Sequence, residues 1–172
     1  MKTQILLVSL FLLFTSSNLY SQSFNVPENY EFKDAADYAA YEKDIINAAN
    51  WLKATPFNEQ EEQRNRVSAF VVKWLSGSPT VIVEINSVIG DFDNKNKGML
   101  VLFMASCAKY VLENQYSKDM RAKHKFALRE MIAVYKSGIG IVKDKKMEKL
   151  IKSDEEGKID EWLAKNLKIG TD

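Results

Sequence analysis

Apolar residues recur at three- and four-residue steps along most of the chain after residue 33, which is the spacing of helices with one buried face. The first such segment is 34–54, and Pro56 follows it. Asp34 and Asp37 favour its start because acidic side chains there meet unpaired N–H groups. A second helix is predicted to begin after Asn58, with Glu61 completing a capping box, and to end at Gly77.

The second half of the chain continues this pattern. Residues 99–108 are all apolar or small, which predicts a central helix surrounded by the others. The next helix is predicted to be capped by Ser117 and to run to about residue 136, before Gly138. Two shorter helices are expected to close the chain, one opened by Asp144 and one preceded by a possible capping box at 153–156.

The segment Thr80–Ile89 is ambiguous. Ser78 and Pro79 are a favourable helix start, but 81–83 and Ile85 are β-branched and also fit a strand. We favour a short helix because no second convincing strand exists to pair with it. The fold class predicted is all-α, with antiparallel helical hairpins forming a bundle or a short α-solenoid of about six to seven helices. No repeated signature connects the hairpins.

The first residues have the layout of a cleavable secretory signal: Lys2, a ten-residue run from Ile5 to Phe14 broken only by Ser9, then a polar stretch. As a helix this run spans about 15 Å, roughly half of a bilayer's hydrocarbon core. The predicted organisation is therefore a signal peptide at 1–21, an extended lead-in at 22–33 and a single helical domain at 34–168. Export to the periplasm or outside the cell is expected, with no transmembrane segment after signal removal.

Charge is balanced overall but unevenly placed. Without Lys2 the chain has 23 basic and 23 acidic residues, which gives no argument for nucleic acid as a partner. Residues 23–94 hold six basic and twelve acidic residues, 118–152 hold eleven basic and four acidic ones, and 153–172 hold three basic and six acidic ones. We expect these three regions to pack near one another and relieve their own repulsion.

The sharpest surface feature is a basic face predicted on the 118–136 helix, made of Lys118, Arg121, Lys125, Arg129 and Lys136. It is either a solvated face, or one paired with the acidic N-terminal helices, or a site for an anionic partner. Such a partner would be an anionic envelope component, such as a lipid headgroup or an acidic glycan, or an acidic protein.

Candidate catalytic chemistry is sparse. His124 is the only histidine and falls on the apolar arc of its helix, where a neutral core residue is the favoured interpretation. Cys107 is the only cysteine, so no internal disulfide and no cysteine–histidine zinc site can form. The loop 91–98 lacks the glycine and glutamate that a calcium-binding EF-hand requires. No catalytic residue, cofactor or metal ligand is predicted.

The leader ending in Tyr20-Ser21-Gln22, with Pro27-Glu28-Asn29-Tyr30 after it, resembles those of small uncharacterised exported helical proteins of Bacteroidota bacteria. The resemblance covers the leader and a few following residues, and it implies a periplasmic or outer-surface location but no activity.

Three function hypotheses follow. The first is a non-enzymatic binding or scaffold module of the envelope or the secreted fraction. The second is a small hydrolase or lyase using Asp and Glu residues in a cleft between helices. The third is an inhibitor or immunity-type partner protein.

Overall fold

The structure is a computed structural model, and it describes residues 23–169. This part of the chain is all-helical and contains no strand, which confirms the predicted fold class. Its elements are α1 (Ala35–Ala40), α2 (Glu42–Ala54), α3 (Glu61–Leu75), α4 (Ser87–Gly90), the 3-10 helix η1 (Asp91–Asp93), α5 (Met99–Glu113), α6 (Met120–Ser137), α7 (Lys145–Glu155) and α8 (Ile159–Leu167). The predicted signal peptide at 1–21 lies outside the described residues.

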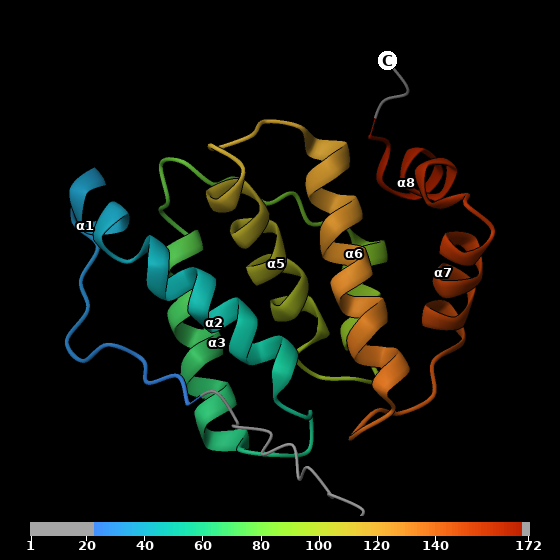
Figure 1. Ribbon diagram of the computed structural model, residues 1–172, viewed down its shortest axis with the longest axis horizontal. Helices are drawn as coiled ribbons and strands as arrows, with labels where there is room; N and C mark the ends of the chain where they lie inside the picture. Colours follow the sequence, from blue (N-terminus) through green and yellow to red (C-terminus); the bar gives the residue numbers. More distant parts are fainter. Residues whose placement is uncertain (1–22, 170–172) are drawn as a thin grey trace, which may run out of the picture.

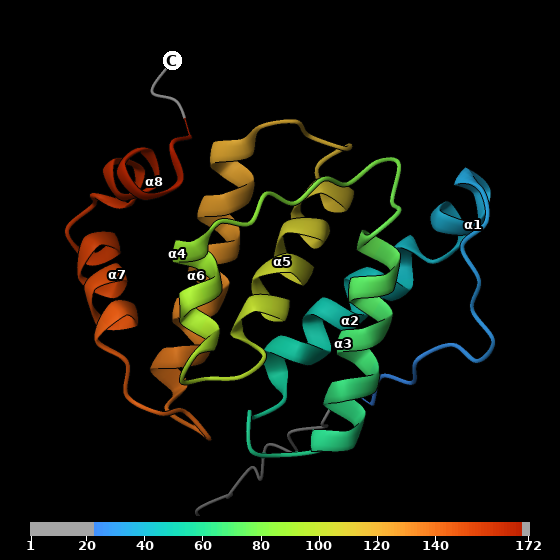
Figure 2. The same ribbon diagram turned by 180° about the vertical axis from the view of Figure 1, so that it is seen from behind.

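Helix α5 is the centre of the molecule, as its unbroken apolar composition predicted. It packs against α2, α3 and α6, and both views of the ribbon place it between them (Figures 1 and 2). Of its side chains, Leu102, Phe103 and Cys107 are fully buried. A helix enclosed on all sides buries apolar surface around its whole circumference, so the other helices need only one apolar face each.

The two ends of the chain cover opposite flanks of this centre. Residues 23–33 run along α3, where Phe24 and Tyr30 contact the ring of Phe70 at centroid distances of 6.3 and 4.9 Å. Helices α7 and α8 pack on each other and on α6, at the right of Figure 1. The last two helices therefore form a hairpin bound to the outer side of α6.

Several predicted helix starts are wrong by a few residues. The cap of α6 is Asp119, whose side chain accepts from the N–H of Ala122, and Ser117 precedes it. Helix α3 begins after Gln60, which has a left-handed conformation and makes no side-chain cap, because 56–59 form a turn. Ser153 lies inside α7 and does not cap α8. By contrast, Asp34 and Asp37 form a capping box at α1, and Asp144 caps α7.

The prediction of a helix over Thr80–Ile89 is also wrong for most of its length. Residues 80–86 are extended, and a helix forms only at Ser87–Gly90. Figure 2 shows this segment crossing above one end of α5, between α3 and α4. It is the wall of the candidate site described next.

Candidate functional site

A hollow of the described residues lies where the extended segment faces the connection between α5 and α6. It has a volume of about 600 Å³ and is lined by residues of 79–84, by residues of 116–123 and by Val111 of α5. We call it the large groove. Its size is within the range of small-molecule sites.

The edges of the large groove carry apolar side chains that solvent reaches. Ile82 is 71% exposed, Tyr116 47% and Met120 39%. Ile85, 45% exposed, lines a smaller pocket of about 80 Å³ on the other side of Glu84. Large apolar side chains gathered around one hollow are typical of binding surfaces, because their burial by a ligand is favourable.

A buried lysine fixes the wall of the groove. Lys123 is 5% exposed, and its ammonium donates to the carbonyl of Ile82 at 2.7 Å and to the carboxylate of Glu84 at 2.8 Å. These contacts tie the extended segment to α6. They also explain why 80–86 is not helical. In a helix the carbonyl of Ile82 would accept from a backbone N–H four residues later, but here it accepts from a side chain about forty positions away.

His124 makes the second tie. It is 1% exposed; its Nδ1 lies 2.7 Å from the carbonyl oxygen of Met120, and its Nε2 lies 3.4 Å from that of Glu84. Its ring packs against Phe103 with centroids 5.5 Å apart. The side chain is thus a buried, hydrogen-bonded member of the core, as the sequence favoured.

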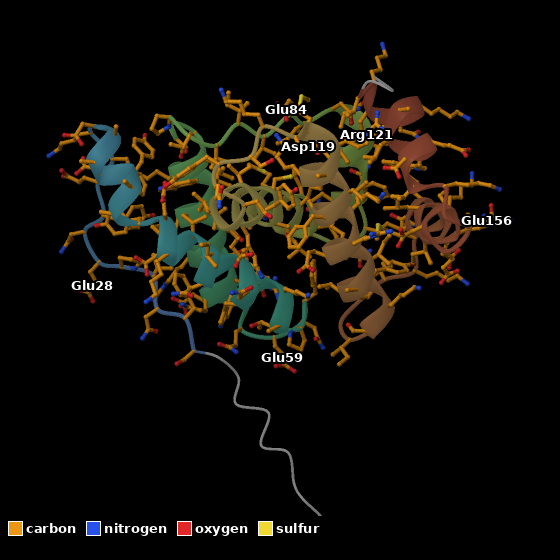
Figure 3. The ribbon with its side chains drawn as sticks, turned by 45° about the horizontal axis from the view of Figure 1, so that its top comes forward. Glu28, Glu59, Glu84, Asp119, Arg121 and Glu156 are labelled. Atoms are coloured by element: carbon orange, nitrogen blue, oxygen red, sulfur yellow. The ribbon has the colours of Figure 1, made fainter. Side chains whose placement is uncertain are left out.

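The electrostatics of this cluster centre on Glu84, which Figure 3 labels at the same end of the molecule as Asp119 and Arg121. Partial burial acts to raise the pKa of Glu84. Three effects outweigh this: the hydrogen bond from Lys123, a hydrogen bond from the backbone N–H of Glu84 itself, and the positive charge of Lys123. Together they lower the pKa of Glu84 below its ordinary value. Glu84 is therefore held as a carboxylate that is already paired.

Cys107 offers no nucleophile to this site. The thiol is fully buried in α5, and burial raises its pKa, an effect that the charge of Lys123 offsets only in part. Among the residues that the structure describes, no group of three His, Cys, Asp or Glu side chains could hold a metal ion. The hydrolase hypothesis requires two acids that line one cleft. The large groove has one acid among its lining residues, and so does a second hollow of about 440 Å³ on α7 and α8.

The residues of the predicted basic face have different surroundings in the structure. Lys125 pairs with Asp160 at 2.6 Å, Arg129 with Asp154 at 3.0 Å and Lys136 with Glu155 at 2.6 Å. The acids come from α7 and α8, whereas the sequence suggested the N-terminal helices. Arg121 also has an interaction partner. Lys118 precedes α6 and lines the large groove.

Lys123 and Glu84 were not identified from the sequence as site residues. A signal for Lys123 was present, since it lies three residues after Met120 and four before Ala127, at the edge of the apolar arc of α6. Glu84 carried no such signal, because its position depends on the path of the extended segment.

Comparison of the chain with protein-family models, with curated proteins and with solved structures gives no match. Within the described residues, none of the helices combines the length and apolar character needed to cross a bilayer.

Proposed function

We propose that this protein is a non-enzymatic binding module whose ligand occupies the large groove. The observation that carries the proposal is the groove of about 600 Å³ edged by the exposed side chains of Ile82, Tyr116 and Met120. A ligand with an apolar body would cover these side chains and gain the free energy of burying them, up to about 1.5–3 kcal/mol for a large side chain that becomes fully enclosed.

The charges of the groove favour an anionic group on that ligand. Lys123 and Glu84 neutralise each other, which leaves Lys118 as an exposed lysine without an ion pair in the described part of the chain. An anion at this edge would face one uncommitted positive charge across a partly apolar surface, where screening by water is reduced. The proposed ligand class is therefore an amphipathic anion, such as an apolar molecule with a carboxylate or sulfonate.

Binding fits this geometry better than catalysis. The carboxylate that lines the groove, Glu84, already accepts a hydrogen bond from Lys123, and its lowered pKa makes it a weak base. We further propose that the module acts in the periplasm or outside the cell. This location rests on the sequence of residues 1–21, outside the described part, and on the resemblance of the leader.

The proposal is tested with two fluorescent probes of similar size. 1-Anilinonaphthalene-8-sulfonate carries a negative charge, and N-phenyl-1-naphthylamine lacks it. Both should bind saturably to the folded protein. Ile82→Asn should weaken both probes by roughly tenfold, because it removes apolar contact area. Lys118→Glu should weaken the sulfonate probe alone.

Val142→Asn is the matched control, since Val142 is 55% exposed and does not line the groove. It should leave both probes unchanged. Equal melting temperatures of the variants would show that a change in probe affinity comes from the groove and not from partial unfolding of the variant. Unchanged binding in Ile82→Asn, or equal weakening in Val142→Asn, would overturn the proposal.

A further inference from the structure

A second hollow lies on the α7–α8 hairpin and shares no lining residue with the large groove. It has a volume of about 440 Å³. Its lining combines one aromatic ring, three lysines and three small or acidic polar side chains: Trp162, Lys149, Lys158, Lys165, Ser153, Glu161 and Asn166. We call it the Trp162 groove. The turn between α7 and α8 that borders this region contains Glu156, labelled at the right of Figure 3.

Trp162 is the aromatic surface of this groove. One part of its indole packs on the core, with the ring of Phe92 at a centroid distance of 6.3 Å, and the side chain as a whole is only half-buried. Its indole N–H makes no hydrogen bond within residues 23–169. A tryptophan that keeps both ring surface and its donor accessible can stack on a flat apolar face and donate to an oxygen.

The lysines give the groove its charge. Lys149 and Lys165 are exposed and form no ion pair in the described part of the chain. Lys158 forms an ion pair with Glu156 at 2.8 Å, and the hydrogen bond that its ammonium donates to that carboxylate raises the pKa of Lys158. The hairpin's acids Asp154, Glu155 and Asp160 pair with α6 and so do not neutralise these lysines.

The remaining polar groups suit hydroxyl groups. Glu161 brings a carboxylate into the groove. The side-chain N–H₂ of Asn166 donates to the carbonyl of Trp162 at 2.8 Å, which leaves the side-chain oxygen Oδ1 of Asn166 able to accept. Ser153 likewise donates to the carbonyl of Lys149 at 3.1 Å and keeps its oxygen as an acceptor.

From these residues we propose that the Trp162 groove binds an acidic sugar, that is, a saccharide ring with a carboxylate or sulfate group. The sugar's C–H face would stack on Trp162, its hydroxyls would donate to Glu161, Asn166 and Ser153, and its anionic group would lie between Lys149 and Lys165. A nucleic-acid strand fits less well, because only one ring is available for the stacking of successive bases.

The test uses the full protein with a galacturonic acid tetrasaccharide, a sulfated heparin tetrasaccharide, neutral maltotetraose and a short single-stranded DNA. Tryptophan fluorescence is a selective signal, because Trp51 and Trp74 are buried and Trp162 is the accessible indole. At least one of the two acidic sugars should shift the tryptophan fluorescence saturably. Binding of the galacturonic acid tetrasaccharide would identify a carboxylate as the recognised group, and binding of the heparin tetrasaccharide alone would identify a sulfate. Maltotetraose should not.

The variant Lys149→Ala/Lys165→Ala should weaken the acidic sugar by about tenfold or more. The control Lys43→Ala/Lys145→Ala removes two exposed lysines outside the groove, which are also without ion pairs in the described residues, and should leave affinity unchanged. Calorimetry should show weaker binding in Trp162→Phe, provided its melting temperature is retained.

Three results would overturn the proposal: no saturable binding of either acidic sugar, equal weakening by the control pair, or equal binding of maltotetraose. Binding of the DNA without either sugar would also overturn it, in favour of a nucleic-acid ligand. The lysine double variant keeps the test decisive if Trp162→Phe does not fold. These outcomes are independent of the probe experiment, because the two grooves share no residue.

Discussion

Lys123 and Lys125 lie two residues apart on α6, and each donates to a carboxylate, yet their surroundings differ. The side chain of Lys123 is 6% exposed and that of Lys125 30% exposed. Lys123 also donates to a backbone carbonyl, so removing its ammonium leaves the carbonyl of Ile82 without this donor and leaves the Glu84 carboxylate without its ion-pair partner. A buried acceptor that loses its donor costs more free energy than a surface ion pair contributes.

We therefore predict that Lys123→Met lowers the free energy of unfolding by about 2–4 kcal/mol. Lys125→Met, the matched control, should lower it by less than about 1 kcal/mol. Urea unfolding followed by far-UV circular dichroism measures both. Equal losses in the two variants would mean that Lys123 does not hold the extended segment.

Sequence spacing could place Lys123 on the apolar side of its helix, but it could not supply the partners. The pattern of α6 puts this residue at the edge of the apolar arc, next to Val134. Its acceptors, Ile82 and Glu84, come from a segment about forty residues earlier in the chain. Helical periodicity is a property of one helix at a time, so it cannot predict a hydrogen bond between two separate segments of the chain.

At the scale of the elements, the connection from α6 to α7 contains two glycines with nearly the same φ angle. Gly138 has a φ of +70° and Gly140 a φ of +69°. A β-carbon on Gly138 would meet open space. On Gly140 it would lie 2.5 Å from the side-chain oxygen of Asn58 and 2.6 Å from the backbone nitrogen of that residue.

Gly138→Ala should thus lower the free energy of unfolding by about 1–2 kcal/mol, which is the cost of a left-handed alanine. Gly140→Ala should lower it by about 2–5 kcal/mol, because the contact with Asn58 adds an overpacking cost to the same backbone strain. Thermal and urea denaturation of both variants check this. If Gly138→Ala is as damaging as Gly140→Ala, the contact with Asn58 has no energetic weight.

The end of α6 at Gly138 could be predicted, because a glycine that adopts the left-handed conformation is a local signal in the sequence. The path of residues 80–86 could not be predicted in this way. Val81 and Val83 are β-branched and compatible with either a short helix or an extended segment. Side chains of α6 favour the extended segment over the helix. Lys123 and His124 contact the backbone carbonyls of Ile82 and Glu84, which in a helix would accept from backbone N–H groups of the same helix. The large groove depends on this outcome, so the sequence could not predict it.

At the scale of the whole molecule, the expectation that basic and acidic regions pack together holds for α6 and the α7–α8 hairpin. The helical wheel could place Lys125, Arg129 and Lys136 on one face, but it could not show whether solvent or acids cover that face. The acids do so at 2.6 to 3.0 Å. The face proposed for an anionic partner is therefore largely occupied by the chain itself. Two lysines without an ion pair among the described residues, Lys149 and Lys165, lie on the outer hairpin.

This arrangement predicts a salt-dependent contribution of the three ion pairs to stability. The triple variant Lys125→Ala/Arg129→Ala/Lys136→Ala should lower the free energy of unfolding by about 1–3 kcal/mol at low salt, since each partly exposed pair contributes up to about 1 kcal/mol. Near 1 M NaCl the screening length falls to about 3 Å, and the difference from the unmodified protein should shrink by at least half. Urea unfolding at several salt concentrations measures this.

The control for this last experiment removes the same number of positive charges elsewhere. Lys43, Lys118 and Lys145 are exposed and have no ion pair in the part of the chain that the structure describes. Their replacement by alanine should change stability by less than about 0.5 kcal/mol at any salt concentration. If the control triple loses as much stability as the paired triple, net charge accounts for the effect. If the loss in the paired triple is independent of salt, packing of the long side chains of α6 holds the hairpin in place and the ion pairs do not.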